Sequence, residues 1–398
     1  MTGDTQPAKI QHAAHLDMLR GIAALAVVAG HSRGFALVDF ATLQNPDLST
    51  KLLYFCTSLG HQAVIAFFAL SGFLVGGRAL SEILAGCWSP ARYCITRLTR
   101  LWTVVLPALA ITFLLDTLGR HLNGATGYDG VFHDLLSSGP SAAAPADTSL
   151  LTLLANVSFL QTIVAPTYGT NSPLWSLANE FWYYAIAPLA FVAAFGKGSS
   201  LARLVYLSTT ILLCAVLPTT LVVLGGIWML GALMHWTSQV ASLQRIFRFR
   251  AYPALALSTV VATIVAPKWG IFAVGDLTGD LALGVAFALL LPGLAAAPAS
   301  NANYVRASSA LSNISFTLYA THFPLLAFLW FTFQAPNQFA PGPYGLAVVI
   351  AYIAVSVAIA ALLWWMFERH THRIRQAISS RLSSTVREYK SSAKGRAA

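Results

Sequence analysis

Ten apolar runs, each about 17 to 25 residues long, constrain the fold of this chain more than any other feature. They cover residues 16–33, 59–78, 101–118, 174–195, 201–218, 222–237, 252–267, 277–294, 310–331 and 344–367. A helix of this length crosses the hydrocarbon core of a membrane. Only 10% of the residues are charged, against about 25% in soluble domains. The sequence therefore predicts an all-α, polytopic integral membrane protein with about ten transmembrane helices.

Basic residues are distributed unequally between the two sides of the predicted membrane domain. If the N-terminus is cytoplasmic, only four of the 24 basic residues fall on the outer side: Arg33, Lys51, Arg120 and Lys268. Cytoplasmic loops carry such an excess of Lys and Arg, so we expect both termini to be cytoplasmic. Membrane orientation also explains the net charge of +10, so nucleic acid is not an expected partner.

The same pattern divides the chain into three regions. Residues 1–15 form a cytoplasmic leader, 16–368 the transmembrane domain, and 369–398 a basic cytoplasmic tail. We expect the tail to contact anionic membrane lipid. None of the four cysteines has CxxC spacing, so the sequence predicts neither a disulfide framework nor a metal site.

One apolar run, 150–166, is short and contains polar residues. If it crossed the membrane, every later loop would change sides, so we expect a re-entrant or interfacial helix on the outer face. The loop that precedes it, 118–149, is the longest on that side. Its Ser-, Pro- and Ala-rich part, 137–149, is expected to be a mobile segment over the outer entrance.

Three ionisable residues share one face of the first predicted helix. Arg20 and His31 are eleven residues apart, which places them on the same face, about 16 Å apart along the axis. Asp17 lies on this face too, where we expect it to pair with Arg20. Because ionisable groups inside a membrane are costly, such a stripe indicates a functional site. The alternative is that Arg20 reaches the interface and His31 lies among hydrated headgroups.

The second run and the segment after it carry small and basic residues. Small residues around 69–77 permit close approach of another helix or form a narrow channel wall. Arg97 and Arg100 follow in a predicted inner loop and are one helical turn apart, so both guanidinium groups can bind one polyanion. The alternative is that they only anchor the loop on the cytoplasmic side.

Four polar side chains share one face of the helix predicted over 174–195: Ser176, Asn179, Glu180 and Tyr183. Glu180 lies about 10 Å inside the start of this helix, too deep to reach water easily. It therefore needs a partner, and the candidates are Arg20, His31 and His322. A purely structural buried pair is the alternative.

The ninth run contains His322 two residues before Pro324. We expect the proline to kink the helix and to free backbone carbonyl groups there. A single buried histidine is more often structural than catalytic, so His31 is the stronger candidate for chemistry.

These stretches together resemble the membrane-bound acyltransferase 3 family, the bacterial O-acyltransferases of cell-surface and secreted glycans. The resemblance covers about residues 15 to 370. Its most specific parts are the Arg-x10-His spacing of Arg20 and His31 and the sequence FFALSGFL at 67–74. The segments containing Arg97-x-x-Arg100, LWSL…E…YY at 174–184 and SFTLYxxH at 315–322 support it.

The chain departs from the family pattern at three places. Met18 stands where the family usually has Gly, Thr103 where it has Pro, and Glu368-Arg369-His370 where it has Glu-x-Pro. No departure removes a titratable group, so they concern the subfamily more than the chemistry.

The resemblance implies transfer of an acyl group, most often acetyl, from cytoplasmic acyl-CoA to a sugar hydroxyl of a surface or secreted polysaccharide. It also implies a multi-pass protein of the bacterial cytoplasmic (inner) membrane. Acyl-CoA is then the donor substrate, and no cofactor is expected to be permanently bound. A glycan or lipid-linked sugar is the expected acceptor, and polysaccharide assembly machinery is a candidate partner.

We assign roles to the polar residues on this basis. Arg20, Arg97 and Arg100 suit the phosphates of CoA, while the thin pantetheine arm reaches His31 through a channel lined by the first, second, fourth and ninth runs. An imidazole titrates near neutral pH, so His31 can take the proton from the acceptor hydroxyl, with Glu180 orienting the ring. The expected substrate-binding residues are Asp17, Ser176, Asn179, Tyr183 and His322.

Two other readings remain open at this stage. In the first, the protein is a transporter or flippase of a lipid-linked sugar, and the polar stripe binds cargo without forming a bond. In the second, it is an acyltransferase whose acceptor is an antibiotic-like small molecule, a lipid or peptidoglycan. Transfer of labelled acetyl from acetyl-CoA separates an enzyme from a transporter.

Overall fold

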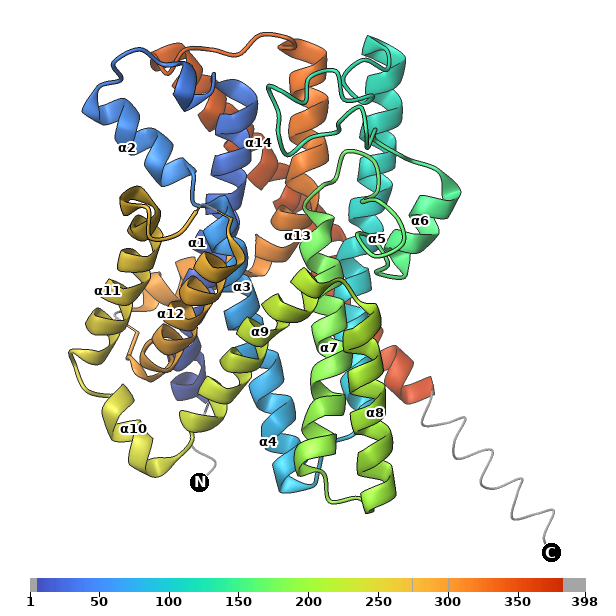
Figure 1. Cartoon of the computed structure of the whole chain (residues 1–398), viewed down its shortest axis with the longest axis vertical. Coiled ribbons are helices and arrows are strands. Elements are labelled where there is room, and N and C mark those ends of the chain that lie inside the picture. Colours follow the sequence, from blue (N-terminus) through green and yellow to red (C-terminus); the bar gives the residue numbers. More distant parts are fainter. Residues whose placement is uncertain (1–5, 274, 300, 382–398) are drawn as a thin grey trace, which may run out of the picture.

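A computed structural model describes residues 6–273, 275–299 and 301–381, without the side chains of 6–13 and 268. The part of the predicted tail beyond residue 381 lies outside the described residues. Figure 1 shows long helices arranged side by side, with most of the longer loops gathered at their upper ends. The only extended pairings among the described residues are isolated bridges. The all-α prediction is therefore confirmed.

The helices in chain order are α1 (Gln6–Ala36), α2 (Leu48–Thr57), α3 (Gly60–Ser71), α4 (Gly77–Ala85), α5 (Pro90–Asn123), α6 (Leu150–Val157), α7 (Leu174–Phe195), α8 (Ser200–Val216), α9 (Thr219–Thr237), α10 (Ala241–Phe247), α11 (Tyr252–Val265), α12 (Leu277–Ala296), α13 (Ala302–Phe333) and α14 (Pro343–Met366). A π-helical turn, Gly72–Gly76, joins α3 to α4. Short 3-10 turns lie at Phe40–Thr42, Ala266–Trp269 and Glu368–His370.

Each of the ten predicted runs is helical in the structure. Six helical segments of the described chain are long and apolar enough to cross a membrane, judged by length and composition: Leu48–Ala85, Pro90–Asn123, Thr219–Thr237, Leu277–Ala296, Ala302–Phe333 and Pro343–Arg381. The apolar helices α8 and α11 are shorter. A helical membrane domain is thus supported, while the count of ten crossings and the cytoplasmic position of both termini stay predictions.

Two predicted boundaries were wrong. Arg97 and Arg100 lie in the first turns of α5 and not in a loop. The helix begins early because the Ser89 side chain accepts a hydrogen bond from the backbone of Arg92 and Pro90 occupies the first turn. The helix expected over 150–166 is limited to α6, whose eight residues extend about 12 Å, too short to cross a membrane.

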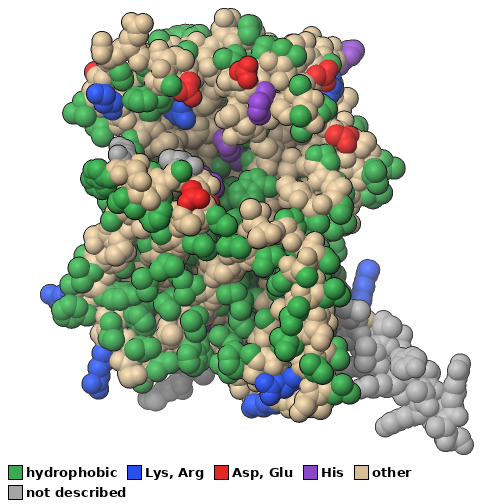
Figure 2. All heavy atoms as spheres, viewed as in Figure 1, with side chains coloured by type: hydrophobic (Ala, Val, Ile, Leu, Met, Phe, Trp, Pro, Cys, Tyr) green, Lys and Arg blue, Asp and Glu red, His purple; other side chains and the backbone are tan. Residues whose placement is uncertain are grey.

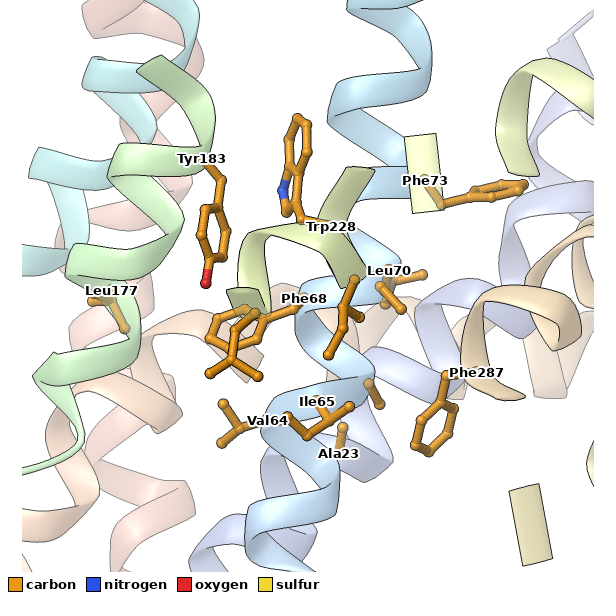
Figure 3. Close-up of a cluster of buried hydrophobic side chains, with 14 of the residues drawn as sticks. Ala23, Val64, Ile65, Phe68, Leu70, Phe73, Leu177, Tyr183, Trp228 and Phe287 are labelled. Carbon is orange, nitrogen blue, oxygen red and sulfur yellow. The ribbon is translucent and has the colours of Figure 1, made fainter. Parts of the chain in front are cut away.

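The core forms where α1, α3, α9, α12 and α13 meet. α1 packs most extensively along α13, and α3 lies between α1, α9 and α12. Figure 3 shows the buried apolar side chains around α3. At Gly72 a Cβ atom would lie 1.9 Å from the carbonyl oxygen of Trp228. The backbone of α9 therefore lies so close to this turn that only glycine fits there.

The proline in α13 explains how the segment before α7 is held. Pro324 has no N–H, which leaves the carbonyl of Ala320 without its helical donor. The side-chain amide of Asn171 donates to that carbonyl at 2.9 Å. Next to it, the backbone N–H and hydroxyl of Thr170 donate to the buried carboxylate of Asp116 on α5. These bonds fix the start of α7 against α5 and α13.

Candidate functional site

Two cavities of nearly equal size lie end to end along α1. The inner cavity, about 490 Å³, is on the side of the molecule where α1 begins and is lined by Arg20, Ser71, Arg97, Arg100, Glu180 and Tyr319 among others. The outer cavity, about 500 Å³, is lined by His31, Arg33, His61, Val64, Trp175 and Tyr319 among others. Figure 2 shows histidine side chains in a hollow halfway up the visible face. The two cavities share Val64 and Tyr319 as lining residues.

Positive charge dominates the inner cavity. Among the described residues, five arginines and one carboxylate, Glu180, line it. The arginines are Arg20, Arg78, Arg97, Arg100 and Arg375. The Nε atom of Arg97 is buried without a hydrogen-bond partner in the described part of the chain. A guanidinium group with an unused N–H donor, in a cavity lined by four other arginines, is suited to bind an anion with several charges.

Hydrogen bonds and ion pairs fix the positions of two of these arginines, Arg20 and Arg100. Arg20 donates to the Ser312 hydroxyl at 3.0 Å and lies 3.5 Å from the Asp17 carboxylate, to which Ser312 also donates. The predicted pair of Asp17 with Arg20 is therefore confirmed. Arg100 lies 3.7 Å from a carboxylate oxygen of Glu368. Asp17 lines neither of the two cavities but a third one of about 400 Å³, which Arg20 and Arg100 also line.

Glu180 does not contact His31, so its predicted role in orienting that imidazole is wrong. Its carboxylate lies in the inner cavity and accepts hydrogen bonds from the hydroxyls of Ser71, at 2.8 Å, and Tyr184. The Ser71 oxygen in turn accepts from the indole N–H of Trp228 on α9. Glu180 is therefore part of the wall of the inner cavity, together with the arginines.

The partner of His31 is His322. The Nδ1 atom of His31 lies 2.8 Å from Nε2 of His322, and the two rings are nearly parallel, with centroids 5.1 Å apart. The edge of Phe323 meets the His31 ring at a centroid distance of 5.0 Å. His322 is completely buried, whereas His31 lines the outer cavity. The structure thus joins two histidines that sequence reasoning ranked separately.

The hydrogen bonds of His322 determine where the protons of the pair lie. Its Nδ1 atom is 2.8 Å from the carbonyl oxygen of Tyr319, and because a carbonyl can only accept, Nδ1 carries the proton. In the neutral ring Nε2 is then an acceptor, so Nδ1 of His31 must donate to it. This assignment leaves Nε2 as the basic nitrogen of His31.

The predicted polar face of α7 is divided in the structure. Ser176 lines the inner cavity, and its hydroxyl lies 2.7 Å from the hydroxyl of Tyr319. Asn179 and Tyr183 line neither cavity, and the Tyr183 hydroxyl donates to the Leu221 carbonyl on α9. Tyr183 thus contacts α9, and the assignment of these two residues to substrate binding stays a prediction. His322 does not line the outer cavity itself and lies behind His31, Tyr319 and Phe323, which do.

Sequence reasoning missed several residues of both cavities. Tyr319 is one of them, although its spacing from Ser315 and His322 (i, i+4, i+7) puts all three on one helix face and was a usable signal. His61 lies 2.7 Å from the Asp280 carboxylate. These two residues are 219 positions apart, so no local pattern could have joined them.

Comparison with known proteins agrees with this architecture. The model of the acyltransferase 3 family, described as an acyltransferase domain, matches residues 14–365, which include both cavities except Arg375 and Thr371. The chain belongs to the acyltransferase 3 family. The resemblance seen in the sequence is therefore confirmed.

One curated relative is acyltransferase MdmB of Streptomyces mycarofaciens. It is 29% identical over 183 residues, which is 46% of this acyltransferase 3 member. The match spans 40% of the relative's own length, so it supports the family and does not carry the relative's substrate to this chain. No solved structure gives a significant match.

Proposed function

We propose that this protein transfers an acyl group, in the main acetyl, from cytoplasmic acyl-CoA to a hydroxyl of a sugar in a surface or secreted polysaccharide. The observation that carries the proposal is the arrangement of the two cavities. An arginine-rich cavity at one end of α1 shares Val64 and Tyr319 in its wall with a second cavity, which is lined by His31 with Nε2 as its basic nitrogen.

The inner cavity suits the donor. CoA carries several phosphate charges at its nucleotide end, and forked guanidinium groups bind phosphates with two hydrogen bonds each. Arg97 offers a buried Nε atom without a partner, and Arg100 and Arg20 are held in place by carboxylates. Phe67, Leu74 and other apolar side chains line the same cavity and suit the pantetheine arm.

His31 acts as general base in this proposal. The acceptor hydroxyl oxygen bonds to the thioester carbonyl carbon while its proton moves to Nε2 of His31. The carbon–sulfur bond then breaks, and the CoA sulfur takes the proton back from the imidazolium. The products are an ester and free CoA, and His31 returns to its neutral form.

Two neighbours support this step without touching the transferred proton. His322 accepts from Nδ1 of His31 and so holds the ring with Nε2 as the base, the orienting role that a carboxylate has in hydrolase triads. Arg33, two residues further along α1, lines the same cavity. Its positive charge favours the negative charge that develops on the carbonyl oxygen.

The outer cavity suits a polar acceptor. His61, Asp39 and Gln338 offer hydrogen-bonding groups, and Trp175 offers an aromatic face on which a sugar ring can pack. Ser137, from the loop predicted to lie over the outer entrance, is also in its wall. These residues are compatible with a sugar acceptor in the periplasmic or extracellular half of the cytoplasmic membrane.

The experiment uses inside-out membrane vesicles that contain the full chain, incubated with acetyl-CoA labelled in the acetyl group. We expect label in a glycan or lipid-linked sugar product, identified by mass spectrometry. His31→Ala should lower the rate by about 10² to 10⁴, the usual contribution of a general base. His121→Ala, at an exposed position on α5, is the matched control and should retain the wild-type rate.

Other products decide between the alternatives. Label in a small molecule, a lipid or peptidoglycan keeps the acyl transfer but replaces the acceptor. Wild-type vesicles that label nothing while moving a lipid-linked sugar across the membrane would establish a transporter and refute the proposal. A His31→Ala variant that is present at normal levels and as fast as the wild type would remove His31 from the chemistry.

A further inference from the structure

Buried and mostly aromatic side chains stand between the two cavities. Val64 on α3 and Tyr319 on α13 line both cavities, and they are 6% and 5% exposed. The Phe67 ring meets the Tyr319 ring edge-on, with centroids 5.8 Å apart. Figure 3 shows Val64 and Phe68 on the side of α3 that faces Leu177 of α7. We call Val64, Tyr319 and their aromatic neighbours the junction.

Aromatic contacts continue around the junction on α7. Trp175 lines the outer cavity and Phe68 the inner one, and their rings meet at a centroid distance of 6.1 Å. Tyr319 cannot swing aside freely because its hydroxyl lies 2.7 Å from the Ser176 hydroxyl and 3.3 Å from the Pro173 carbonyl oxygen. Its backbone is held as well, because its carbonyl accepts from His322. The junction is therefore built from side chains with few alternative positions.

In the proposed reaction the acyl group leads the pantetheine arm from the inner cavity toward His31, so it has to pass this junction. Beyond the carbonyl group that all these donors share, a straight acyl chain enters end-on and presents only the width of one methylene group. A chain branched next to the carbonyl or one carbon beyond presents an additional methyl group at the same level. The junction therefore selects acyl groups more strongly by their width than by their length.

We propose that Val64 and Tyr319 form a width filter that admits straight short acyl groups and rejects branched ones. The filter rests on the proposed function, since it acts on a thioester that crosses from one cavity to the other. It assigns donor specificity to the junction and not to the arginines, which bind the nucleotide end that all acyl-CoA molecules share.

The experiment measures initial rates in inside-out vesicles with acetyl-CoA, butyryl-CoA and isovaleryl-CoA, supplied separately at equal concentration. We expect the wild type to use acetyl and butyryl groups and to use isovaleryl at least about 10-fold more slowly, as one additional methyl group in a tight apolar site costs. Val64→Ala should raise the isovaleryl-to-acetyl rate ratio about 10-fold. Tyr319→Phe, which removes the hydroxyl tether, should raise the same ratio.

Val349→Ala is the matched control, because Val349 is equally buried but lies on α14 and lines neither cavity. Its rate ratio should equal that of the wild type. Val64→Phe tests the filter from the opposite direction. It should abolish transfer of every acyl group while purified protein still binds CoA, measured by calorimetry, because the inner cavity keeps its arginines.

The outcomes separate the filter from the proposed function. If wild-type vesicles transfer none of the three acyl groups, the acyltransferase reaction proposed above fails and the filter fails with it. If the wild type is active and Val64→Ala keeps the wild-type ratio, or Val64→Phe transfers acetyl normally, only the filter is refuted. A changed ratio in Val64→Ala with an unchanged ratio in Val349→Ala supports it.

Discussion

At the scale of single residues, the orientation of His31 depends on a side chain 291 positions away. The Arg-x10-His spacing predicted that His31 is functional, because helical periodicity is visible within one segment. It did not predict that His322 is its partner, because the relative rotation and depth of α1 and α13 are tertiary properties. The same reason explains the error at Glu180, whose depth in α7 was predicted but whose partner Ser71 on α3 was not.

The pair of histidines gives the first prediction. In His322→Leu the Nδ1–H of His31 loses its acceptor, so the ring is free to rotate and to take the other tautomer. We expect kcat to fall about 10-fold, which equals about 1.4 kcal/mol and is comparable to one lost hydrogen bond. KM for acetyl-CoA should stay unchanged because His322 does not line the inner cavity.

A conservative variant distinguishes a role of His322 in positioning the His31 ring from a role in protein stability alone. In His322→Gln the side-chain oxygen can still accept from His31, so part of kcat should return although a buried polar group remains. If both variants reduce the amount of folded protein equally and kcat per folded molecule is unchanged, His322 is structural only. Rates normalised to protein quantified by size-exclusion chromatography make that comparison.

At the scale of elements, α5 brings its arginines to the cavity because it begins much earlier than the apolar pattern predicted. Hydropathy places the boundary of a membrane span where charges begin, but a helix with a serine cap and proline in its first turn continues through them. Arg97 and Arg100 therefore have fixed positions on a rigid element. A loop would have to pay ordering entropy before binding the same anion.

This rigidity leads to the second prediction. In the double variant Arg97→Gln and Arg100→Gln, two guanidinium groups that would face phosphate are removed. Each charge-assisted hydrogen bond contributes about 1.5 to 3 kcal/mol, so we expect KM for acetyl-CoA to rise at least about 10-fold, with a smaller change in kcat. The measurement is the rate as a function of acetyl-CoA concentration in vesicles.

The matched control for this variant is Arg245→Gln. Arg245 is an exposed arginine in the last turn of α10 and lines neither cavity. Arg245→Gln removes one positive charge, as does each of the two changes in the double variant. A general effect of net charge on KM would therefore appear in both proteins. An unchanged KM in the double variant would disprove the role of these arginines in donor binding.

At the scale of the whole molecule, most of the fold was accessible from the sequence because a membrane permits few backbone solutions. Apolar length and periodicity predicted where helices lie. They did not predict the π-helical turn at Gly72–Gly76. They also did not predict that Asn171 donates to the Ala320 carbonyl, which has no helical donor because of Pro324. Both features depend on neighbouring helices. The two cavities were likewise beyond sequence reasoning, because their common walls combine residues of α3 and α13, Val64 and Tyr319, that are far apart in the sequence.

The two cavities make the molecule asymmetric across the membrane, and the last prediction tests that asymmetry. The five arginines lie in the cavity on the side where α1 begins, which the distribution of basic residues predicts to be cytoplasmic. Acyl-CoA is a polyanion that does not cross a bilayer. Inside-out vesicles should therefore transfer acetyl from external acetyl-CoA, and right-side-out vesicles should do so only after detergent has opened them. Equal rates in both sealed preparations would show that acetyl-CoA reaches its site from either side of the membrane, and delivery of the donor from the cytoplasmic side alone would then be wrong.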